Sequence, residues 1–178
     1  MLKIHQLFLR TYITIFVAVL ITLTLVTYFW AKNLYLNQIE KNLIQNIDTL
    51  SIVLKDSNNI TNIKNIVKNL HSELSLRITI IDENGVVIAE SDKDLVDINN
   101  HSNRVEIIQA KNKGFGKDKR VSETINKELL YIAKKVVLNE STYYIRMADY
   151  TNRITDNFIK LTLEIFIYIS FFLIIAFL

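Results

Sequence analysis

The hydrophobic pattern divides this chain into two long apolar stretches and a mixed region between them. The first stretch, Thr11 to Ala31, holds 21 positions without a charged residue. As a helix that rises about 1.5 Å per residue, it crosses a hydrocarbon core of roughly 30 Å. Tyr28, Phe29 and Trp30 close it with the aromatic side chains typical of a membrane interface. A cleaved signal peptide is the alternative, but its apolar core is shorter and small residues follow it. The pattern therefore predicts a transmembrane helix at 11–31.

The second apolar stretch, residues 161–178, is still apolar where the chain stops. It predicts a second transmembrane helix, apparently truncated, because no basic residue follows it. We therefore expect the chain to be a piece of a longer protein; a complete protein with an apolar tail is the alternative. Lys3 and Arg10 precede the first span, so the positive-inside rule places residues 1–10 in the cytoplasm and residues 32–160 outside it.

Two amphipathic helices are predicted at the start of the region between the spans. Apolar residues from Leu36 to Leu54 recur at spacings of three and four, which places them on one stripe of a helix. No Pro or Gly lies between Trp30 and Leu54, so this helix can continue directly from the first span. The stripe fits either a domain core or a dimer seam, and we favour the core. A second stripe predicts a helix that begins near Asn59 or Thr61.

The rest of this region has the pattern of an antiparallel sheet. The stretch from Arg77 to Ser91 contains two β-branched runs around Asn84-Gly85, which predicts a hairpin with a type I′ turn. After a short helix at 100–110, three more strands are expected at 120–124, 129–138 and 142–148. The predicted fold class is therefore α+β, with a long N-terminal helix and with the helices on one face of the sheet.

Charge and composition exclude several classes of function. Residues 32–160 hold 19 Lys and Arg against 17 Asp and Glu, a balance that argues against binding nucleic acid. The absence of cysteine fits an exported domain without disulfides. Six carboxylates between Asp82 and Asp97 predict a solvated loop; the calcium-loop pattern is missing, so we predict no metal site. The basic segment from Lys111 to Arg120 either attracts this acidic loop or faces an anion.

No catalytic residue and no cofactor site can be assigned in this chain. His71 precedes Ser-Glu-Leu, which differs from a phospho-acceptor motif in the place of the Glu and in the lack of a Pro, and it lies outside the membrane. The segment Gly114-Phe115-Gly116 has neither the third glycine nor the Lys-Ser pair of a phosphate-binding loop. A cysteine nucleophile is also absent.

Four segments in order resemble the extracytoplasmic sensor of PhoR-like bacterial histidine kinases, a PAS-like or single-Cache fold. They cover roughly residues 75 to 148 and are Arg77-Ile-Thr-Ile-Ile-Asp-Glu-Asn-Gly, Asn100-His101-Ser-Asn-Arg104-Val-Glu106, Gly114-Phe-Gly-Lys-Asp-Lys-Arg120-Val-Ser-Glu-Thr124 and Leu130-Tyr131-Ile-Ala. This family usually has Pro where Val105 stands, and Pro would mark the first position of a helix more clearly.

The resemblance implies the membrane-anchored N-terminal part of a two-component sensor histidine kinase, acting as a homodimer in the bacterial inner membrane with two passes. The kinase core, with its ATP and Mg²⁺, would lie beyond Leu178 and would pass phosphate to a response regulator. The signal would be an unidentified extracytoplasmic molecule or protein. The alternatives are the input region of a chemoreceptor or of a diguanylate cyclase, and a free-standing membrane-tethered binding protein.

In Cache-like sensors the ligand pocket lies between the sheet and the segments that connect its strands. The resemblance then implies that six residues line a signal pocket: His101, Arg104, Arg120, Ser122, Tyr131 and Arg146. Arginine offers a bidentate fork for carboxylate or phosphate, and tyrosine offers a ring and a hydroxyl. Several also have a structural interpretation: His101 or Asn100 as the cap of the short helix, Arg104 as a partner of the acidic loop, Tyr131 as a half-buried strand residue.

Overall fold

The computed structural model describes residues 4–55, 60–92, 100–122, 126–151 and 153–177. These residues form two compact units, which are described separately. One consists of Met1–Leu36 with Arg153–Leu178, and the other of Asn37–Asn152. The predicted domain boundaries at residues 32 and 160 stay a prediction.

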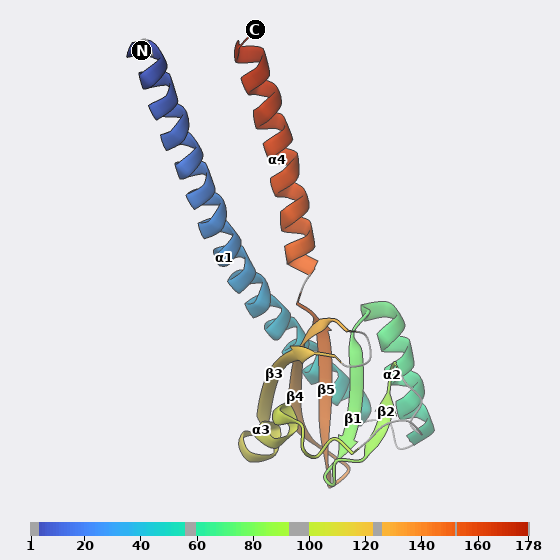
Figure 1. The fold of residues 1–178 in the computed structure, drawn as a ribbon. Coiled ribbons are helices and arrows are strands. Elements are labelled where there is room, and N and C mark those ends of the chain that lie inside the picture. Colours follow the sequence, from blue (N-terminus) through green and yellow to red (C-terminus); the bar gives the residue numbers. More distant parts are fainter. Residues whose placement is uncertain (1–3, 56–59, 93–99, 123–125, 152, 178) are drawn as a thin grey trace. The chain divides into compact units, whose positions relative to one another are not determined.

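The order of elements is two helices, a hairpin, a helix, three strands and a helix (Figure 1). The helices are α1 (Ile4–Lys55), α2 (Ile60–Leu74), α3 (Val105–Lys113) and α4 (Arg153–Phe177). The strands are β1 (Arg77–Asp82), β2 (Val87–Glu90), β3 (Phe115–Val121), β4 (Glu128–Leu138) and β5 (Ser141–Tyr150). This is the predicted α+β class, with the expected long N-terminal helix.

Helix α1 is continuous for 52 residues and contributes to both units. Its apolar stripe in the second unit is a core face, since the side chains of Ile39, Leu43, Ile47 and Leu50 are at most 4% exposed. The core interpretation of the stripe is therefore confirmed for these positions. In the described part of the chain, one helix segment, Gln6–Lys55, is long and apolar enough to cross a membrane. That α4 forms a second span stays a prediction.

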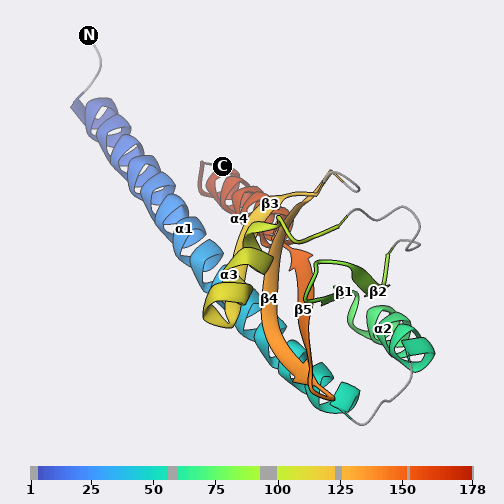
Figure 2. The ribbon, with the colours of Figure 1, turned by 90° about the horizontal axis from the view of Figure 1, so that it is seen from below.

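The five strands form one antiparallel sheet in the order β2-β1-β5-β4-β3. Since side chains alternate along a strand, one face carries Ile78, Ile80, Ile132, Ile145 and Met147, all buried. The C-terminal part of α1 passes behind the sheet in Figure 1, and α3 crosses in front of it. The expectation of helices on one face is therefore wrong. Helix α2 packs beside β1 and β2 at the sheet edge (Figure 2).

The β1–β2 connection is a hairpin, but not the predicted type I′ turn. Gly85 has φ +86°, whereas Asn84 is not among the described residues with positive φ. The amide of Gly85 donates to the carbonyl of Asp82 at 3.1 Å, and the Asp82 carboxylate accepts from the amides of Asn84 and Val86. The Asp82 carboxylate thus holds a longer loop, in which a single positive-φ residue suffices.

The type I′ geometry occurs instead at the β4–β5 hairpin. Asn139 and Glu140 both have positive φ, 48° and 66°, between the paired residues Leu138 and Ser141. A two-residue loop with positive φ at both positions matches the twist of the two flanking strands.

Helix α3 and strand β3 begin and end at other residues than predicted. The helix starts at Val105 with Arg104 as its N-cap residue, and it ends at Gly114, which has φ +79° and donates its amide to Ala110. Strand β3 then begins at Phe115, not at residue 120. Because Gly114 alone separates the helix from the strand, no loop forms between them. Most of the basic segment from Lys111 to Arg120 therefore belongs to the edge strand of the sheet.

In the unit formed by 1–36 and 153–178, the described side chains of α1 and α4 contact one another. The ring of Tyr28 meets the ring of Phe158 edge to face, with the centroids 5.1 Å apart. Nearby Thr24 and Thr162 turn their hydroxyls to backbone carbonyls of their own helices, at 2.8 Å each. The packing between these helices is therefore largely apolar.

Candidate functional site

The sheet face that lies under α3 carries a row of polar side chains. Strand register places Thr79 of β1 opposite both Glu90 of β2 and Arg146 of β5. On β4 the residue in register with Arg146 is Ala133, and two positions away on the same face Tyr131 of β4 lies opposite Asp118 of β3. We call this set, together with Glu106 of α3, Arg120 of β3 and Arg77 of β1, the sheet-face network.

Arg146 lies at the centre of the network and is 3% exposed. Its Nη2 and Nε donate to the hydroxyl of Thr79 at 3.0 and 3.3 Å, and its Nη1 donates to Glu106 at 3.3 Å. Glu90 lies 3.8 Å from Nη2 and accepts a hydrogen bond from Thr79 at 2.8 Å. The guanidinium therefore joins β1, β2, β5 and α3.

Glu106 connects α3 to the edge strand. It is fully buried, and its two carboxylate oxygens accept from Nη1 and Nη2 of Arg120 at 2.8 and 2.9 Å. Arg120 also pairs with Asp118, two residues earlier on β3. Its guanidinium carbon lies 3.9 Å from the centroid of the Tyr131 ring, and that of Arg146 lies 5.4 Å away. Tyr131, only 2% exposed, thus contacts two cations instead of lying half-buried on its strand.

Burial and pairing set the protonation of these groups. Burial opposes ionisation of Glu106, but the hydrogen bonds and charge of Arg120 and the charge of Arg146 outweigh it, so the pKa of Glu106 is lowered. Burial likewise opposes the charge of Arg120, whose pKa is nevertheless raised by its bonds to Glu106. For Arg146, burial dominates over Glu106 and Glu90 and lowers the pKa.

The buried side chain of His101 lies beside this network. It is 6% exposed, and its Nδ1 has no hydrogen-bond partner among the described residues. Burial and the charges of Arg146, Arg104 and Arg77 lower its pKa to about 4, so the imidazole is neutral at pH 7. The backbone fixes its position, since the amide of His101 donates to the carbonyl of Gly85 at 2.8 Å.

Of the six predicted pocket residues, four gather around the network and two do not. His101, Arg120, Tyr131 and Arg146 are joined by contact or by charge, as described above. Arg104 is the N-cap residue of α3, without a side-chain capping bond, and acts on His101 through its charge. Ser122 is buried at the end of β3, where its amide donates to Lys127 and its carbonyl accepts from Asn126. It therefore closes the turn into β4.

The expected helix cap is also different. Asn100 does not cap α3: its Nδ2 donates to the carbonyl of Asn84 at 2.9 Å, and its Oδ1 accepts from the amide of Ser102 at 2.7 Å. Asn100 and His101 together attach the segment before α3 to the β1–β2 loop. Of the acidic stretch that was expected to pair with Arg104, Asp94 and Asp97 lie outside the described residues.

Sequence reasoning missed Thr79, Glu90 and Glu106, which are all buried. Glu90 was assigned to a solvated acidic loop, but it ends β2 and faces Arg77 at 3.1 Å as well as Thr79. The sequence did contain a signal for Glu90. It follows a β-branched run, and the alternation of side chains along a strand would place it on the same face as Ile88. The partners lie 11 and 67 residues from Thr79 in sequence, so only the register reveals them.

Outside the network, Arg77 also connects β1 to α2. Arg77 lies 3.9 Å from Asp92, and Asp92 lies 3.4 Å from Nε2 of His71. The Nδ1 of His71 is 2.8 Å from the carbonyl oxygen of Leu76. His71 therefore has a structural place at the end of α2, between a carbonyl and a carboxylate. No group of three or more His, Cys, Asp or Glu that could hold a metal occurs in the described ranges.

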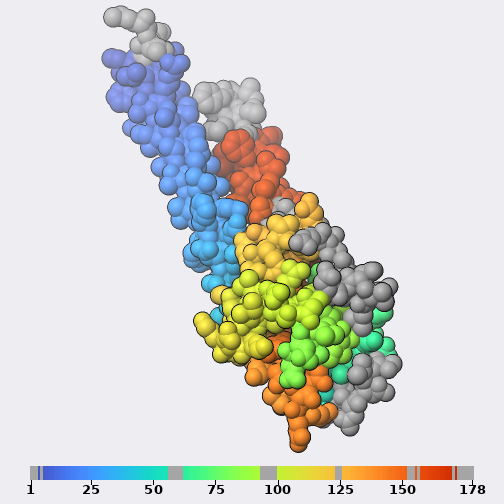
Figure 3. Space-filling view, turned by 60° about the horizontal axis from the view of Figure 1, so that its bottom comes forward, coloured from blue at the N-terminus to red at the C-terminus, as the bar shows by residue number. Residues whose placement is uncertain are grey.

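The charges of the network are balanced. Arg77, Arg120 and Arg146 stand against Glu90, Glu106 and Asp118, and each of these arginines lies within 4 Å of at least one of these acids. In the space-filling view, the segment 100–113, in yellow-green, lies at the surface (Figure 3). A guest molecule that added a net charge would therefore upset the charge balance of these six side chains.

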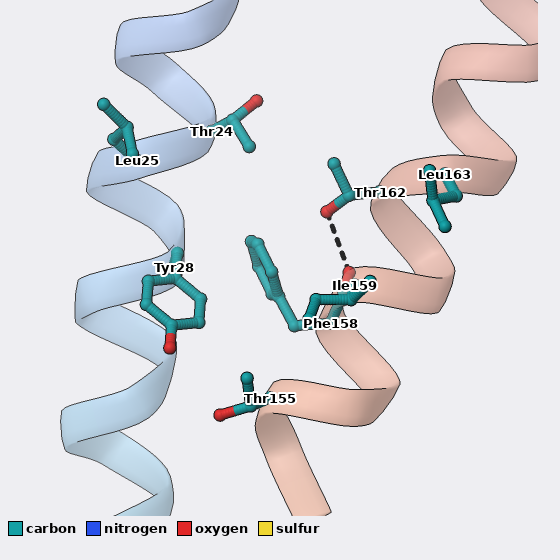
Figure 4. Close-up of a pocket in the computed structure, with 8 residues that line it drawn as sticks. All are labelled: Thr24, Leu25, Tyr28, Thr155, Phe158, Ile159, Thr162 and Leu163. Carbon is teal, nitrogen blue, oxygen red and sulfur yellow. Dashed lines mark hydrogen bonds between the residues drawn. The ribbon is translucent and has the colours of Figure 1, made fainter. Parts of the chain in front are cut away.

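A pocket of about 290 Å³ lies between α1 and α4 (Figure 4). Its lining residues are Thr24, Leu25, Tyr28, Thr155, Phe158, Ile159, Thr162 and Leu163. Because the hydroxyls of Thr24 and Thr162 are bonded to their own helices, the pocket offers mainly apolar surface. That surface selects no particular ligand.

A scan of known protein families finds no model that matches this sequence, and a search of curated proteins finds no match either. Similar folds occur among solved structures. The ligand-binding domain of Mlp24 with asparagine has a TM-score of 0.52 and 16% identity, over 72% of this chain and 58% of that one. A methyl-accepting chemotaxis protein from Vibrio parahaemolyticus RIMD 2210633 has a TM-score of 0.48 and 19% identity, over 71% and 98%.

The ligand-binding domain of the Campylobacter jejuni chemoreceptor Tlp3, in complex with 4-methylisoleucine, has a TM-score of 0.47 and 14% identity, over 66% of this chain and 50% of that one. This chain thus spans 58% of the Mlp24 domain and half of the Tlp3 domain. Identities this low bear on the fold alone. The chain shares the α+β fold of the Mlp24 ligand-binding domain.

Proposed function

We propose that this chain is the extracytoplasmic sensing and membrane-anchoring region of a bacterial transmembrane receptor. The observation that carries the proposal is α1, a single helix that contains a membrane-length apolar segment and also supplies a core face of the sheet domain. A conformational change in the domain that moves this helix would therefore also move the segment in the membrane. The shared fold with a ligand-binding domain supports a sensory role for the sheet.

The proposed topology has two passes, α1 and α4, with the N-terminus in the cytoplasm and the sheet domain outside. The chain contains no cysteine, so single cysteines can report it. We expect a membrane-impermeant thiol reagent to label Lys113→Cys on intact cells and to leave Gln6→Cys unlabelled until the cells are lysed. Labelling of both on intact cells would contradict the topology.

The output of the receptor lies outside this chain. The output is that of a chemoreceptor or that of a histidine kinase, as the sequence resemblance implies. A distant likeness in fold does not fix the output domain. The sequence that follows Leu178 in the gene would decide: a long coiled coil supports the chemoreceptor, and a His-containing dimerisation helix with an ATP-binding domain supports the kinase.

We further propose that a small molecule with no net charge acts at the sheet-face network. His101 offers a buried ring nitrogen without a partner, next to Arg146 and Glu106. Since the network is already neutral, a zwitterion or an uncharged polar molecule would preserve its charge balance. The asparagine in the Mlp24 structure is a ligand of this class.

The test is a thermal-shift series with the full chain in detergent micelles. L-Asparagine and other neutral amino acids are compared with dicarboxylates and inorganic phosphate at equal concentration. At about 100 times the Kd, a true ligand stabilises the folded state by about 2.7 kcal/mol. We expect stabilisation by a zwitterion and its loss in His101→Ala. No shift with any compound would favour regulation by a protein partner.

A further inference from the structure

Lys117 of β3 binds helices on both faces of the sheet. Its backbone amide donates to Oε1 of Gln109 on α3 at 2.9 Å. Its ammonium lies 3.2 and 3.0 Å from the two carboxylate oxygens of Glu40 on α1. This one residue therefore connects the helix over the sheet-face network with the helix that contains the apolar span.

The strand beneath α3 is built for close contact with that helix. A Cβ at Gly116 would meet the carbonyl oxygen of Glu106 and would lie 2.7 Å from Cβ of Gln109. The backbone of α3 thus rests directly on β3, and the ion pair of Glu106 with Arg120 ties the two together a second time. Since β3 is an edge strand, bonded to β4 alone in the sheet, a shift of α3 can move β3 with it.

A second ion pair joins the sheet to α1 but has no such link to α3. Lys134 of β4 pairs with Asp48 of α1. Its backbone lies inside the sheet, in register with Phe115 on one side and Ile145 on the other. Lys134 therefore provides a matched control for the effect of a lysine–carboxylate pair on α1.

We propose that Lys117 is a positioning residue that couples the place of α3 on the sheet to α1. The coupling is a property of the fold, and its use in signalling rests on the proposed function. An exposed pair of this type is weak, so the expected coupling is small and must be measured as a difference between variants.

The experiment is hydrogen exchange of the full chain in detergent micelles, without any ligand. Gln109→Ala removes the α3 contact in three backgrounds: wild type, Lys117→Met and Lys134→Met. We expect Gln109→Ala to speed exchange of β3 amides in all three, because the backbone contact is lost in each. It should speed exchange of α1 amides 37–44 about two- to threefold in wild type and in Lys134→Met, and leave them unchanged in Lys117→Met.

Lys117→Arg keeps the charge and the backbone donor, so it should restore the effect on α1. An equal effect on α1 in all three backgrounds would overturn the proposal, and so would its loss in both lysine variants. Since no ligand is added, these results are independent of the thermal-shift test: a chain without a small-molecule ligand can still show the coupling.

Discussion

Glu106 and Arg120 form a two-pronged ion pair, 2.8 and 2.9 Å long, that joins the first turn of α3 to the edge strand β3. Glu106 has no exposed surface, and its second cationic neighbour, Arg146, is buried as well. One carboxylate thus contacts two guanidinium groups from two strands. These contacts hold α3 against the sheet.

Glu106→Gln should destabilise the domain by roughly 3–5 kcal/mol, because it removes the buried carboxylate that accepts hydrogen bonds from Arg120 and Arg146. Asp118→Asn is the matched control: it removes another carboxylate bound to Arg120, but from a side chain that is 24% exposed, and should cost about 1 kcal/mol or less. Urea unfolding of both variants at pH 7 measures the difference. Similar losses in the two variants would mean that burial of Glu106 does not decide its contribution.

The sequence predicted those parts of the fold that depend on local periodicity. The stripe from Ile39 to Leu50 has the spacing of a helix face, and it is a core face in the structure. To predict the sheet-face network, one must know which residues are paired across neighbouring strands. The periodicity of the sequence does not give this register. Arg146 was chosen as a candidate, but its partners Thr79 and Glu106 lie 67 and 40 residues away.

The type of the hairpin turns was the other feature that the sequence did not predict correctly. Asn84-Gly85 is the pair most typical of a type I′ turn. The carboxylate of Asp82 competes by accepting two backbone amides, which stabilises a longer loop. In contrast, Asn139-Glu140 forms the type I′ turn because the strands on either side pair up to Leu138 and Ser141. A local side-chain hydrogen bond therefore decided the first turn, and strand pairing decided the second.

Gly85 and Gly114 allow a matched test of backbone conformation against close packing. Both have positive φ, 86° and 79°. A Cβ at Gly114 would meet nothing within 4 Å, whereas one at Gly85 would lie 2.6 Å from Cβ of Ser102. We expect Gly114→Ala to cost about 1 kcal/mol. Gly85→Ala should cost roughly 1–3 kcal/mol more, since the segment before α3 must move.

Chemical denaturation of the two glycine variants gives both values. Gly85→Val should be at least as destabilising as Gly85→Ala, since a β-branched side chain at positive φ is strained further. If Gly85→Ala and Gly114→Ala lost the same stability, the approach of Ser102 to Gly85 would have no energetic role.

Glu140→Gly should stabilise the protein. Glu140 has φ +66° in the β4–β5 turn, a conformation that costs a side-chain-bearing residue roughly 1 kcal/mol. The change creates the Asn-Gly pair that type I′ turns prefer, and the expected gain is about 0.5–1 kcal/mol after the greater freedom of glycine in the unfolded chain is counted. A rise of the thermal midpoint checks it, and Glu140→Ala, which retains a Cβ, should give no such rise.

His101 should make the domain sensitive to acid. The pKa of a free histidine is 6.5, and in the folded domain burial and the charges of Arg146, Arg104 and Arg77 lower it to about 4. The unfolded chain therefore binds a proton more readily between these values, so stability is fully present above pH 6.5 and falls as the pH drops towards 4. A shift of this size corresponds to a loss of roughly 3 kcal/mol.

His101→Gln separates this effect from the titration of the carboxylates, because glutamine fills a similar space and carries no charge at any pH. We expect the wild-type chain to lose roughly 3 kcal/mol more stability than His101→Gln between pH 6.5 and 4, as measured by urea unfolding across this range. The carboxylates contribute equally to both proteins and cancel in the difference. A difference that stays constant with pH would show that the imidazole of His101 titrates normally in the folded domain, and that the three arginines do not act on it as the structure implies.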